Sequence, residues 1–361
     1  MKNFSYFLIY LILIIQNQFS LSSDNSIQKM VIQVPIASIF TEPTEILDLN
    51  KPYFLDDDLS THNTQVIYGD YVLEKISENG WSKIIAIQQP NYNRRTKEWN
   101  YCEGWIESKN LKNINEFSSK NLIISSLWAN IYSEPNNLKD PMFKLPIASY
   151  LDGKQINKNW WSVSLLNNTQ GYIKSCDVRE LNKTKEKSIP QLRQDIAETA
   201  ELFLNQPYVW GGTSAFDTDE KKIITGVDCA GLVGLTYKSF GIKIPRDSHP
   251  QYAKAKPILH GKDLQPGDLA FLKQEKHNYE RVSHVMIYIG DQMFIESTGK
   301  KGVYGTQKVS AKNRFGKELS EIYNEDIAED KEANQRFKLC FGSFLNNPED
   351  IAQMMDQTIK I

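Results

Sequence analysis

The sequence predicts an α+β protein, in which two small all-β domains precede a larger domain of mixed helices and strands. Two observations carry this prediction. The segment Ala-Ser-Ile-Phe-Thr-Glu-Pro at residues 37–43 returns as Ala-Asn-Ile-Tyr-Ser-Glu-Pro at residues 129–135, which indicates an internal repeat. Beyond residue 190 the apolar spacing becomes helical and is then followed by separate strand-like runs.

The two copies share further segments, each rich in β-type residues. Asn79-Gly-Trp81 corresponds to Asn159-Trp-Trp161, and Gly104-Trp-Ile106 corresponds to Gly171-Tyr-Ile173. Short runs of Ile, Val, Tyr and Trp that are broken by Gly, Asn and Pro are typical of small antiparallel barrels. We therefore expect one barrel per copy, with most of the tryptophans in the barrel cores.

The domain limits follow from the repeat and from a polar stretch behind it. We place the first barrel at residues 30–113 and the second at residues 120–182. The charged stretch at 182–188 predicts a linker. The third domain then covers residues 190–346, and residues 347–361 form a tail that begins with a short amphipathic helix.

The third domain has one helical segment near its start and several strands further on. A helix is expected over residues 190–205, where apolar residues recur at helical spacing. Apolar runs predict strands at residues 269–272, 285–289 and 293–295. A tight turn at Gly290-Asp291 is expected to join the last two strands. Charged, Gly-containing stretches at 217–222 and 313–335 predict surface loops.

Composition is that of an ordinary globular chain without an excess of positive charge. The 361 residues carry a formal net charge of -2, and 40% of them are hydrophobic. A nucleic-acid-binding protein needs a basic surface, so this balance argues against nucleic acid as a partner. The four cysteines match no zinc pattern and allow at most one structural disulfide. We expect neither a metal site nor a cofactor.

The first residues have the pattern of a secretory leader. Lys2 precedes an apolar run at residues 4–15, and small residues follow at 20–23. The run is shorter than the roughly 20 apolar residues that a membrane-spanning helix needs. We predict a signal peptide at residues 1–23, no stable membrane span after its removal, and a periplasmic or extracellular location in the cell envelope. A leader that stays attached as an anchor is the alternative.

Cys229 has the local sequence of a reactive thiol. Asp228 suits the N-cap of a helix that begins at Cys229, continues with apolar residues at helical spacing and closes at Gly241. The start of a helix provides partial positive charge and unpaired N–H groups, which stabilise a thiolate. For Cys102, Cys176 and Cys340 a buried structural role is the better interpretation.

A base and an orienting group follow at suitable places. His284 opens the apolar strand His-Val-Met-Ile-Tyr-Ile, a rigid element that can hold an imidazole at a fixed distance from a thiolate. Glu296 ends the next strand across the predicted hairpin, where its carboxylate could accept the second imidazole N–H. A solvated charge at a strand end is the alternative for Glu296. The other histidines lie in polar surroundings.

These residues lie in five sequence blocks that together resemble one peptidase family. The blocks are Tyr208-Val-Trp-Gly-Gly-Thr-Ser, Val227-Asp-Cys-Ala-Gly-Leu-Val, Pro245-Arg-Asp-Ser, Leu264-Gln-Pro-Gly-Asp-Leu-Ala-Phe and Ser283-His-Val-Met-Ile-Tyr-Ile-Gly. In order and spacing they resemble the NlpC family of cell-wall cysteine peptidases. The resemblance covers about residues 193–344 and implies a circularly permuted papain-like fold. It also implies that Cys229 is the nucleophile, His284 the base and Glu296 the third polar group.

The two preceding copies resemble bacterial SH3-like domains, which narrows the resemblance. Paired SH3-like domains before such a peptidase are similar to the γ-D-glutamyl-diamino acid endopeptidases, which act on peptidoglycan stem peptides with a free N-terminal L-Ala. This similarity implies substrate contacts for Tyr101, Tyr208, Asp228, Asp247 and Ser248. An anionic wall at Asp247 would suit the ammonium group of the substrate. The implied partners are stem peptides or murein fragments, and we expect a monomer.

Three departures from the family pattern bear on the chemistry. Ala230 follows the nucleophile, where the family usually has Ser, and Glu296 stands where His is more usual. An insertion centred on residues 215–225 could reshape the groove. None of these removes a catalytic group. An N-acetylmuramoyl-L-alanine amidase of the same fold and a non-catalytic wall-binding protein remain as alternatives.

Overall fold

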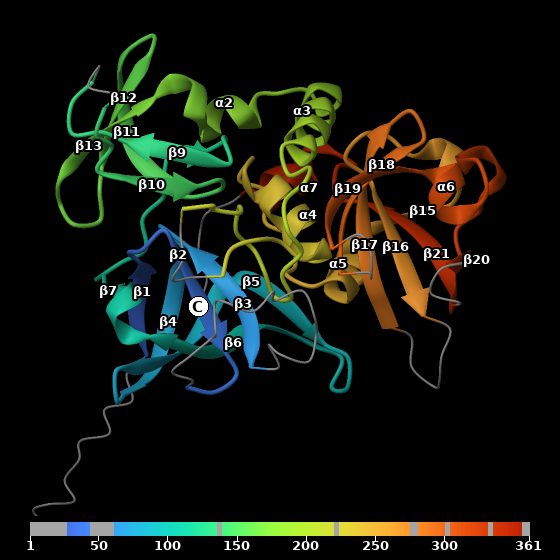
Figure 1. Ribbon diagram of the computed structural model, residues 1–361, viewed down its shortest axis with the longest axis horizontal. Helices are drawn as coiled ribbons and strands as arrows, with labels where there is room; N and C mark the ends of the chain where they lie inside the picture. The colour runs from blue at the N-terminus through green and yellow to red at the C-terminus, as the bar shows by residue number, and fades with distance from the viewer. Residues whose placement is uncertain are drawn as a thin grey trace, which may run out of the picture.

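The computed structural model describes residues 27–43, 61–135, 139–219, 224–274, 281–299, 304–330 and 335–355. The predicted signal peptide lies outside these residues. The described chain is α+β, as the sequence predicts: the part before residue 181 is almost entirely strand, and the later part combines helices with one large sheet (Figure 1). None of the helices in the described ranges is both long and apolar enough to cross a membrane.

The first part forms a seven-stranded antiparallel sheet in the order β3-β2-β6-β5-β4-β1-β7. Its elements are β1 (Gln28–Ile32), β2 (Ile36–Phe40), β3 (His62–Ile67), β4 (Tyr71–Glu78), β5 (Trp81–Asn93), β6 (Glu98–Glu107), the 3-10 helix η1 (Ser108–Asn110) and β7 (Leu111–Asn113). Alternate apolar side chains of these strands, among them Ile39, Ile84 and Ile106, are fully buried and form one core.

The second part has a five-stranded sheet in the order β13-β12-β11-β8-β14 and a separate pair, β10-β9. Its elements are β8 (Leu122–Ile124), β9 (Trp128–Ile131), β10 (Phe143–Pro146), β11 (Tyr150–Asn157), β12 (Trp160–Ser164), β13 (Gln170–Lys174), the 3-10 helix η2 (Ser175–Asp177) and β14 (Val178–Glu180).

The sequence repeat has a structural counterpart in these two parts. A Cβ on Gly104 would lie 2.6 Å from Cγ2 of Ile39, and a Cβ on Gly171 would lie 2.6 Å from Cγ2 of Ile131, its counterpart in the second copy. Only glycine fits at both positions, because the repeated Ala-x-Ile strand packs directly on the glycine backbone. The following residues also pair alike, Phe40 with Trp105 and Tyr132 with Tyr172.

The third part is a sheet in the order β15-β21-β16-β17-β18-β19, with β20 added beside β21. Its strands are β15 (Lys256–Ile258), β16 (Leu269–Gln274), β17 (Arg281–Gly290), β18 (Met293–Thr298), β19 (Gly305–Ser310), β20 (Asp326–Asp330) and β21 (Gln335–Ser343). The helices are α2 (Leu181–Lys185), α3 (Ile189–Glu201), α4 (Cys229–Lys238), α5 (Ser248–Lys254), α6 (Ala311–Phe315), α7 (Pro348–Met354), η3 (Gly261–Asp263) and η4 (Leu319–Glu321).

The sequence located the main helices and strands of this part, and two local expectations were wrong. The polar stretch at 182–188, predicted as a linker, begins within the short helix α2. Residues 313–335, expected as a loop, include the end of α6, η4 and the edge strand β20. The turn between β17 and β18 consists of Asp291 and Gln292, both with positive φ (48° and 64°), because the register shifts near Gly290.

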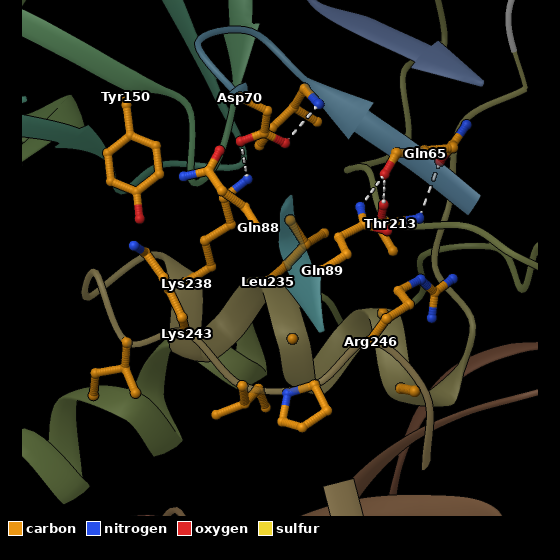
Figure 2. A pocket seen from close by; sticks show the side chains of 17 residues that line it. Gln65, Asp70, Gln88, Gln89, Tyr150, Thr213, Leu235, Lys238, Lys243 and Arg246 are labelled. Carbon is orange, nitrogen blue, oxygen red and sulfur yellow. Dashed lines mark hydrogen bonds and ion pairs between the residues drawn. The ribbon is translucent and has the colours of Figure 1, made fainter. Parts of the chain in front are cut away.

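One core joins the third part to both β-rich parts. Buried residues of α3, α4, β16 and β17 share a cluster with Ile67 of the first part and with Ile123 and Tyr150 of the second. At the last residue of α4, the side chain of Lys238 pairs with Asp70 at 2.5 Å and lies over the ring of Tyr150 (Figure 2). The helix α7, which we had set apart as a tail, buries Ile351 in the same core. The helix α4, which begins at Cys229, therefore shares its core with both β-rich parts and with α7.

Candidate active site

Cys229 is the first residue of α4, and its neighbours fix that helix end. Asp228 is the N-cap, and its Oδ1 accepts a 2.6 Å hydrogen bond from the backbone N–H of Gly231. The helix ends after Lys238, before Gly241, whose φ of +77° stops the helical path. The N-cap and the helix start thus lie where the sequence predicts them. A thiol there meets the positive end of the helix dipole.

His284 lies on β17, and Glu296 lies on the neighbouring strand β18. Nε2 of His284 donates to Oε2 of Glu296 at 2.7 Å. Glu296 is 1% exposed and is held in turn by Gln307, whose Nε2 donates to Oε1 at 2.8 Å. Arg314 approaches Oε2 at 3.4 Å. The carboxylate is therefore a fixed, fully buried acceptor and not a solvated charge at a strand end.

The imidazole connects the thiol to this carboxylate. The side chain of Cys229 interacts with His284, and because Nε2 faces Glu296, Nδ1 is the nitrogen left to face the thiol. Burial alone would lower the pKa of His284, but its bonds to Cys229 and Glu296 raise that pKa to about 9. Burial likewise opposes ionisation of Glu296, and the bond from His284 prevails, which lowers the pKa of Glu296 to about 2. The arrangement favours a charged imidazole next to the thiol.

Cys229 and His284 open onto a cavity of about 650 Å³ between the first and third parts of the chain, and Glu296 lies buried behind His284. Its walls come from the hairpin end of β5 and from β3 on one side, and from the starts of α4, α5 and β17 on the other. Cys229 and His284 both line it. A cavity of this size accommodates a short peptide.

Four of the five predicted substrate-contact residues line this cavity, and one does not. Tyr208, Asp228, Asp247 and Ser248 are in the lining. Tyr101 lies outside it: its side chain is 43% exposed on β6, at the level of Pro90. The register of β5 and β6 shifts between Ala86 and Pro90, and residues 91–95 of the hairpin form the wall instead.

Asp228 and Asp247 differ in what they can offer a ligand. Both oxygens of Asp228 are already bonded to Arg246, at 3.1 and 2.8 Å. Asp247 is 54% exposed because it faces the cavity, and Arg246 approaches it only at 3.6 Å. Desolvation in the cavity raises the pKa of Asp247, with Arg246 opposing the effect and Asp228 adding to it. Asp247 is thus the carboxyl that remains available to a cation.

Sequence reasoning missed three residues that build this site. Arg246 stands in one of the quoted motifs but had no role assigned, and it is buried against Asp228. His62 was placed in a polar part of the first copy, yet it is 2% exposed and lines the cavity. Its Nδ1 donates to the carbonyl of Trp210 at 2.8 Å, and burial lowers its pKa to about 4. Gln65 bonds the same loop. No local pattern marks contacts between such distant segments.

The insertion before Cys229 contacts the second part of the chain in its described portion. Lys144 pairs with Asp217 at 2.6 Å, and Nε1 of Trp128 donates to the carbonyl of Phe216 at 2.8 Å. The cavity lining does not include residues 215–219. In its described portion the insertion therefore fastens two parts of the chain together.

Across the residues that the structure describes, the cysteines and the other potential metal ligands form no metal-binding cluster. All four cysteines are free thiols. Within the described ranges, no group of three or more His, Cys, Asp or Glu side chains is arranged to hold a metal ion.

Comparisons with known proteins find a family match over the segment that contains Cys229, His284 and Glu296. Residues 205–321 match the NlpC/P60 family. The chain is 29% identical to a γ-D-glutamyl-L-lysine dipeptidyl-peptidase of Bacillus cereus, over 74% of this chain and 77% of that protein. It is 27% identical to the Bacillus subtilis protein of the same name, over 66% of this chain and 73% of that protein.

A solved structure shares the fold along most of the chain. The crystal structure of an NlpC/P60 family protein from Bacillus cereus matches with a TM-score of 0.64, over 88% of this chain and 100% of that chain, at 23% sequence identity. Residues 205–321 therefore form an NlpC/P60 domain, which follows a mostly β-stranded N-terminal region.

Proposed function

We propose that this protein is a cysteine endopeptidase that hydrolyses the bond between γ-D-glutamate and the diamino acid in peptidoglycan stem peptides. The observation that carries the proposal is the chain of contacts from Cys229 through His284 to the buried Glu296, open to one peptide-sized cavity. The names of the two similar Bacillus proteins supply the bond. The predicted leader supports action in the cell envelope, in wall turnover or recycling.

In the proposed mechanism the Cys229 thiolate attacks the γ-carbonyl carbon of D-glutamate. The resulting oxyanion lies near the start of α4, where the backbone N–H of Cys229 can donate to it. The His284 imidazolium gives its proton to the departing amine of the diamino acid, and the C–N bond breaks. Neutral His284 then takes a proton from water, which attacks the thioester and releases L-Ala-D-Glu. Glu296 keeps the imidazole oriented throughout.

The charges of the cavity fit a peptide that carries both signs. Asp247 offers a carboxylate to an N-terminal ammonium group, which supports specificity for a free L-Ala. Three arginines, Arg94, Arg95 and Arg281, also line the cavity. Stem peptides carry free carboxylates that such guanidinium groups bind. Tyr101 contributes no support, because it lies outside the lining.

We further propose that the N-terminal parts are two SH3-like barrels and that the third part is a circularly permuted papain-like domain. The equivalent packing of Gly104 on Ile39 and of Gly171 on Ile131 supports two copies of one unit. The order of the elements, with the Cys-bearing helix α4 before the His-bearing strand β17, supports the second assignment.

The experiment is digestion of a purified peptide, L-Ala-γ-D-Glu-L-Lys, followed by mass analysis of the products. The proposal expects L-Ala-D-Glu and free lysine from the wild-type protein, and neither from Cys229→Ala. Digestion of muropeptides separates the amidase alternative, which would release an intact stem peptide. Turnover that persists in Cys229→Ala would sink the assignment of the nucleophile.

A further inference from the structure

We propose that Arg246 is a positioning residue, through which the first β-rich part of the chain fixes the start of the catalytic helix α4. The inference rests on the proposed role of Cys229 as the nucleophile. Arg246 does not line the catalytic cavity. We propose that it acts on the nucleophile through Asp228, the residue that caps the helix next to Cys229, and its longer approach to Asp247, at 3.6 Å, reaches the substrate side of the cavity instead.

The contact between Arg246 and Asp228 is a buried, two-pronged ion pair. Nη1 donates to Oδ1 at 3.1 Å and Nη2 to Oδ2 at 2.8 Å. The same carboxylate accepts from the N–H of Gly231, one turn into α4, and from the N–H of Gly211 at 3.1 Å. Because these four bonds share one carboxylate, its orientation sets the positions of both backbone segments that flank Cys229.

The guanidinium group is in turn held by the first part of the chain. Nε of Arg246 donates to Oγ1 of Thr64 on β3 at 2.7 Å, and its backbone N–H donates to the carbonyl of Pro90 on β5 at 2.9 Å. Thr64 is 0% exposed and is itself oriented by a 3.0 Å bond to Gln89. Each of the three guanidinium nitrogens thereby makes a hydrogen bond, Nη1 and Nη2 to the helix cap and Nε to the N-terminal sheet.

The same strand also holds the loop that reaches Asp228 from the other side. Oε1 of Gln65 accepts from the N–H of Thr213 at 3.0 Å (Figure 2). It also accepts from Oγ of Ser214 at 2.9 Å, while Nε2 of Gln65 donates to the carbonyl of Ile224. His62 bonds the carbonyl of Trp210. Strand β3 thus holds the loop of Gly211 as well as the guanidinium, and both meet at one carboxylate.

The consequence for catalysis follows from the tolerance of the reaction. Attack needs the sulfur within near-contact distance of the carbonyl carbon, and a misplacement of 1 Å can cost roughly 10²-fold in rate. Loss of the bond that Arg246 donates to Thr64 leaves the ion pair with Asp228 in place but frees the guanidinium to shift. We therefore expect a catalytic defect without loss of the fold.

The test is Thr64→Val in the full chain, which removes one hydroxyl at nearly constant volume. A matched control is Thr199→Val. Thr199 on α3 is 2% exposed and accepts a 2.9 Å bond from Nη2 of Arg179, which also contacts Ser239 at the far end of α4. Both variants lose one Arg-to-Thr bond, and Thr64→Val also loses the bond to Gln89. Only Thr64 lies on the path to Asp228.

Two readouts separate positioning from general stability. The first is the steady-state rate per reactive Cys229, where Thr64→Val should lose on the order of 10-fold in kcat, with KM changed less than about twofold. The second is the alkylation rate of Cys229 by iodoacetamide, followed on the peptide that contains it. The exposed Cys176 is the internal reference. Thr64→Val should slow alkylation at Cys229 and leave it unchanged at Cys176.

A second variant, Arg246→Lys, tests the shape of the group. A lysine ammonium keeps the charge but cannot make two parallel bonds to Asp228, so the kcat of Arg246→Lys should fall below the wild-type value. If Arg246→Lys keeps the wild-type kcat, the positioning role is wrong. The role is equally wrong if Thr64→Val matches wild type in kcat and in Cys229 alkylation, or if Thr199→Val shows the same defect.

The alkylation readout does not depend on the bond that the enzyme cleaves. If the wild-type protein fails to cleave the test peptide, yet Thr64→Val still slows alkylation of Cys229 relative to Cys176, the proposed substrate is wrong and the positioning role stands. If the wild-type protein cleaves the peptide but Thr64→Val leaves alkylation of Cys229 unchanged, the proposed substrate stands and the positioning role is wrong.

Discussion

Nε2 of His284 lies 2.7 Å from Oε2 of Glu296, and this carboxylate is 1% exposed. The contact fixes which imidazole nitrogen faces the thiol of Cys229. Burial lowers the pKa of His284, but the bonds to Cys229 and to Glu296 together raise that pKa to about 9. The pH range of activity therefore depends on both of these partners of His284.

Glu296→Gln is expected to reduce activity and to narrow its pH range. The neutral amide can keep a hydrogen bond but no longer stabilises the imidazolium, so kcat should fall on the order of 10²-fold, the lower end for general acid–base groups. The imidazolium deprotonates through the raised pKa of His284, so activity of the wild-type protein is lost as pH rises through about 9. In the variant this alkaline limb moves to lower pH.

The profile of kcat/KM against pH measures the effect. Glu201→Gln is a suitable control, because it removes a carboxylate from an exposed pair with Lys308 on the same sheet edge. An alkaline limb in Glu296→Gln that coincides with that of the wild-type protein would contradict the role of the carboxylate.

The local part of this site is predictable from sequence, because each signal lies within one element. Asp228 before Cys229 marks a helix start, and the continuous apolar run after His284 marks a strand. The contact between His284 and Glu296 then follows from one hairpin. The same local reasoning located α3, α4 and β16 to β18.

The remaining contacts leave no local pattern, because they join distant segments. Arg246 bonds Thr64 across 182 positions, and Gln65 bonds Ile224 across 159. Tyr101 illustrates a second limit: which side chains of a hairpin face a cavity depends on a register shift, here between Ala86 and Pro90, that composition does not reveal.

His62 should make the protein sensitive to acid. Its pKa falls to about 4 in the folded state because burial disfavours the charged ring, whereas the unfolded chain has the ordinary value of 6.5. The unfolded state therefore binds the proton more tightly, and stability is lost as pH falls from 6.5 towards 4. The loss approaches roughly 3 kcal/mol.

Urea unfolding at several pH values between neutral and acid checks this. In His62→Gln the amide can still bond Trp210 and has no proton to gain, so the free energy of unfolding should depend less on pH in that interval. If the free energy of unfolding of His62→Gln falls equally steeply with pH, the acid sensitivity comes from groups other than His62.

Gly231 and Gly234 on α4 should respond oppositely to alanine. A Cβ on Gly231 would lie 2.0 Å from the carbonyl oxygen of Gly212, which must shift, whereas nothing lies within 4 Å of a Cβ on Gly234. Gly234→Ala should stabilise the protein by about 0.5–1 kcal/mol, since alanine is the better helix former. Gly231→Ala should destabilise it and lower kcat. Thermal unfolding of both variants decides, and a stabilising Gly231→Ala would be inconsistent with this packing.

The cavity arginines should select peptides with free carboxylates. Arg94→Gln is expected to raise KM for a peptide with free carboxylates about 3- to 10-fold, the range of a partly exposed charged hydrogen bond. The amidated form of the same peptide should show little change. Arg336→Gln serves as a control, because that residue pairs with Glu329 on the exposed edge β20–β21. Equal changes in KM for the free and the amidated peptide would show that Arg94 does not act on a substrate carboxylate.

The central claim, that Cys229 carries the acyl group, is tested most directly by acid quenching the wild-type protein during turnover of L-Ala-γ-D-Glu-L-Lys. Mass analysis of the peptide that contains Cys229 should then show one L-Ala-D-Glu group in thioester linkage, absent from the peptides of Cys102, Cys176 and Cys340. Product formation with the group on another residue, or with His284→Ala accumulating it as fast as the wild-type protein, would contradict the account.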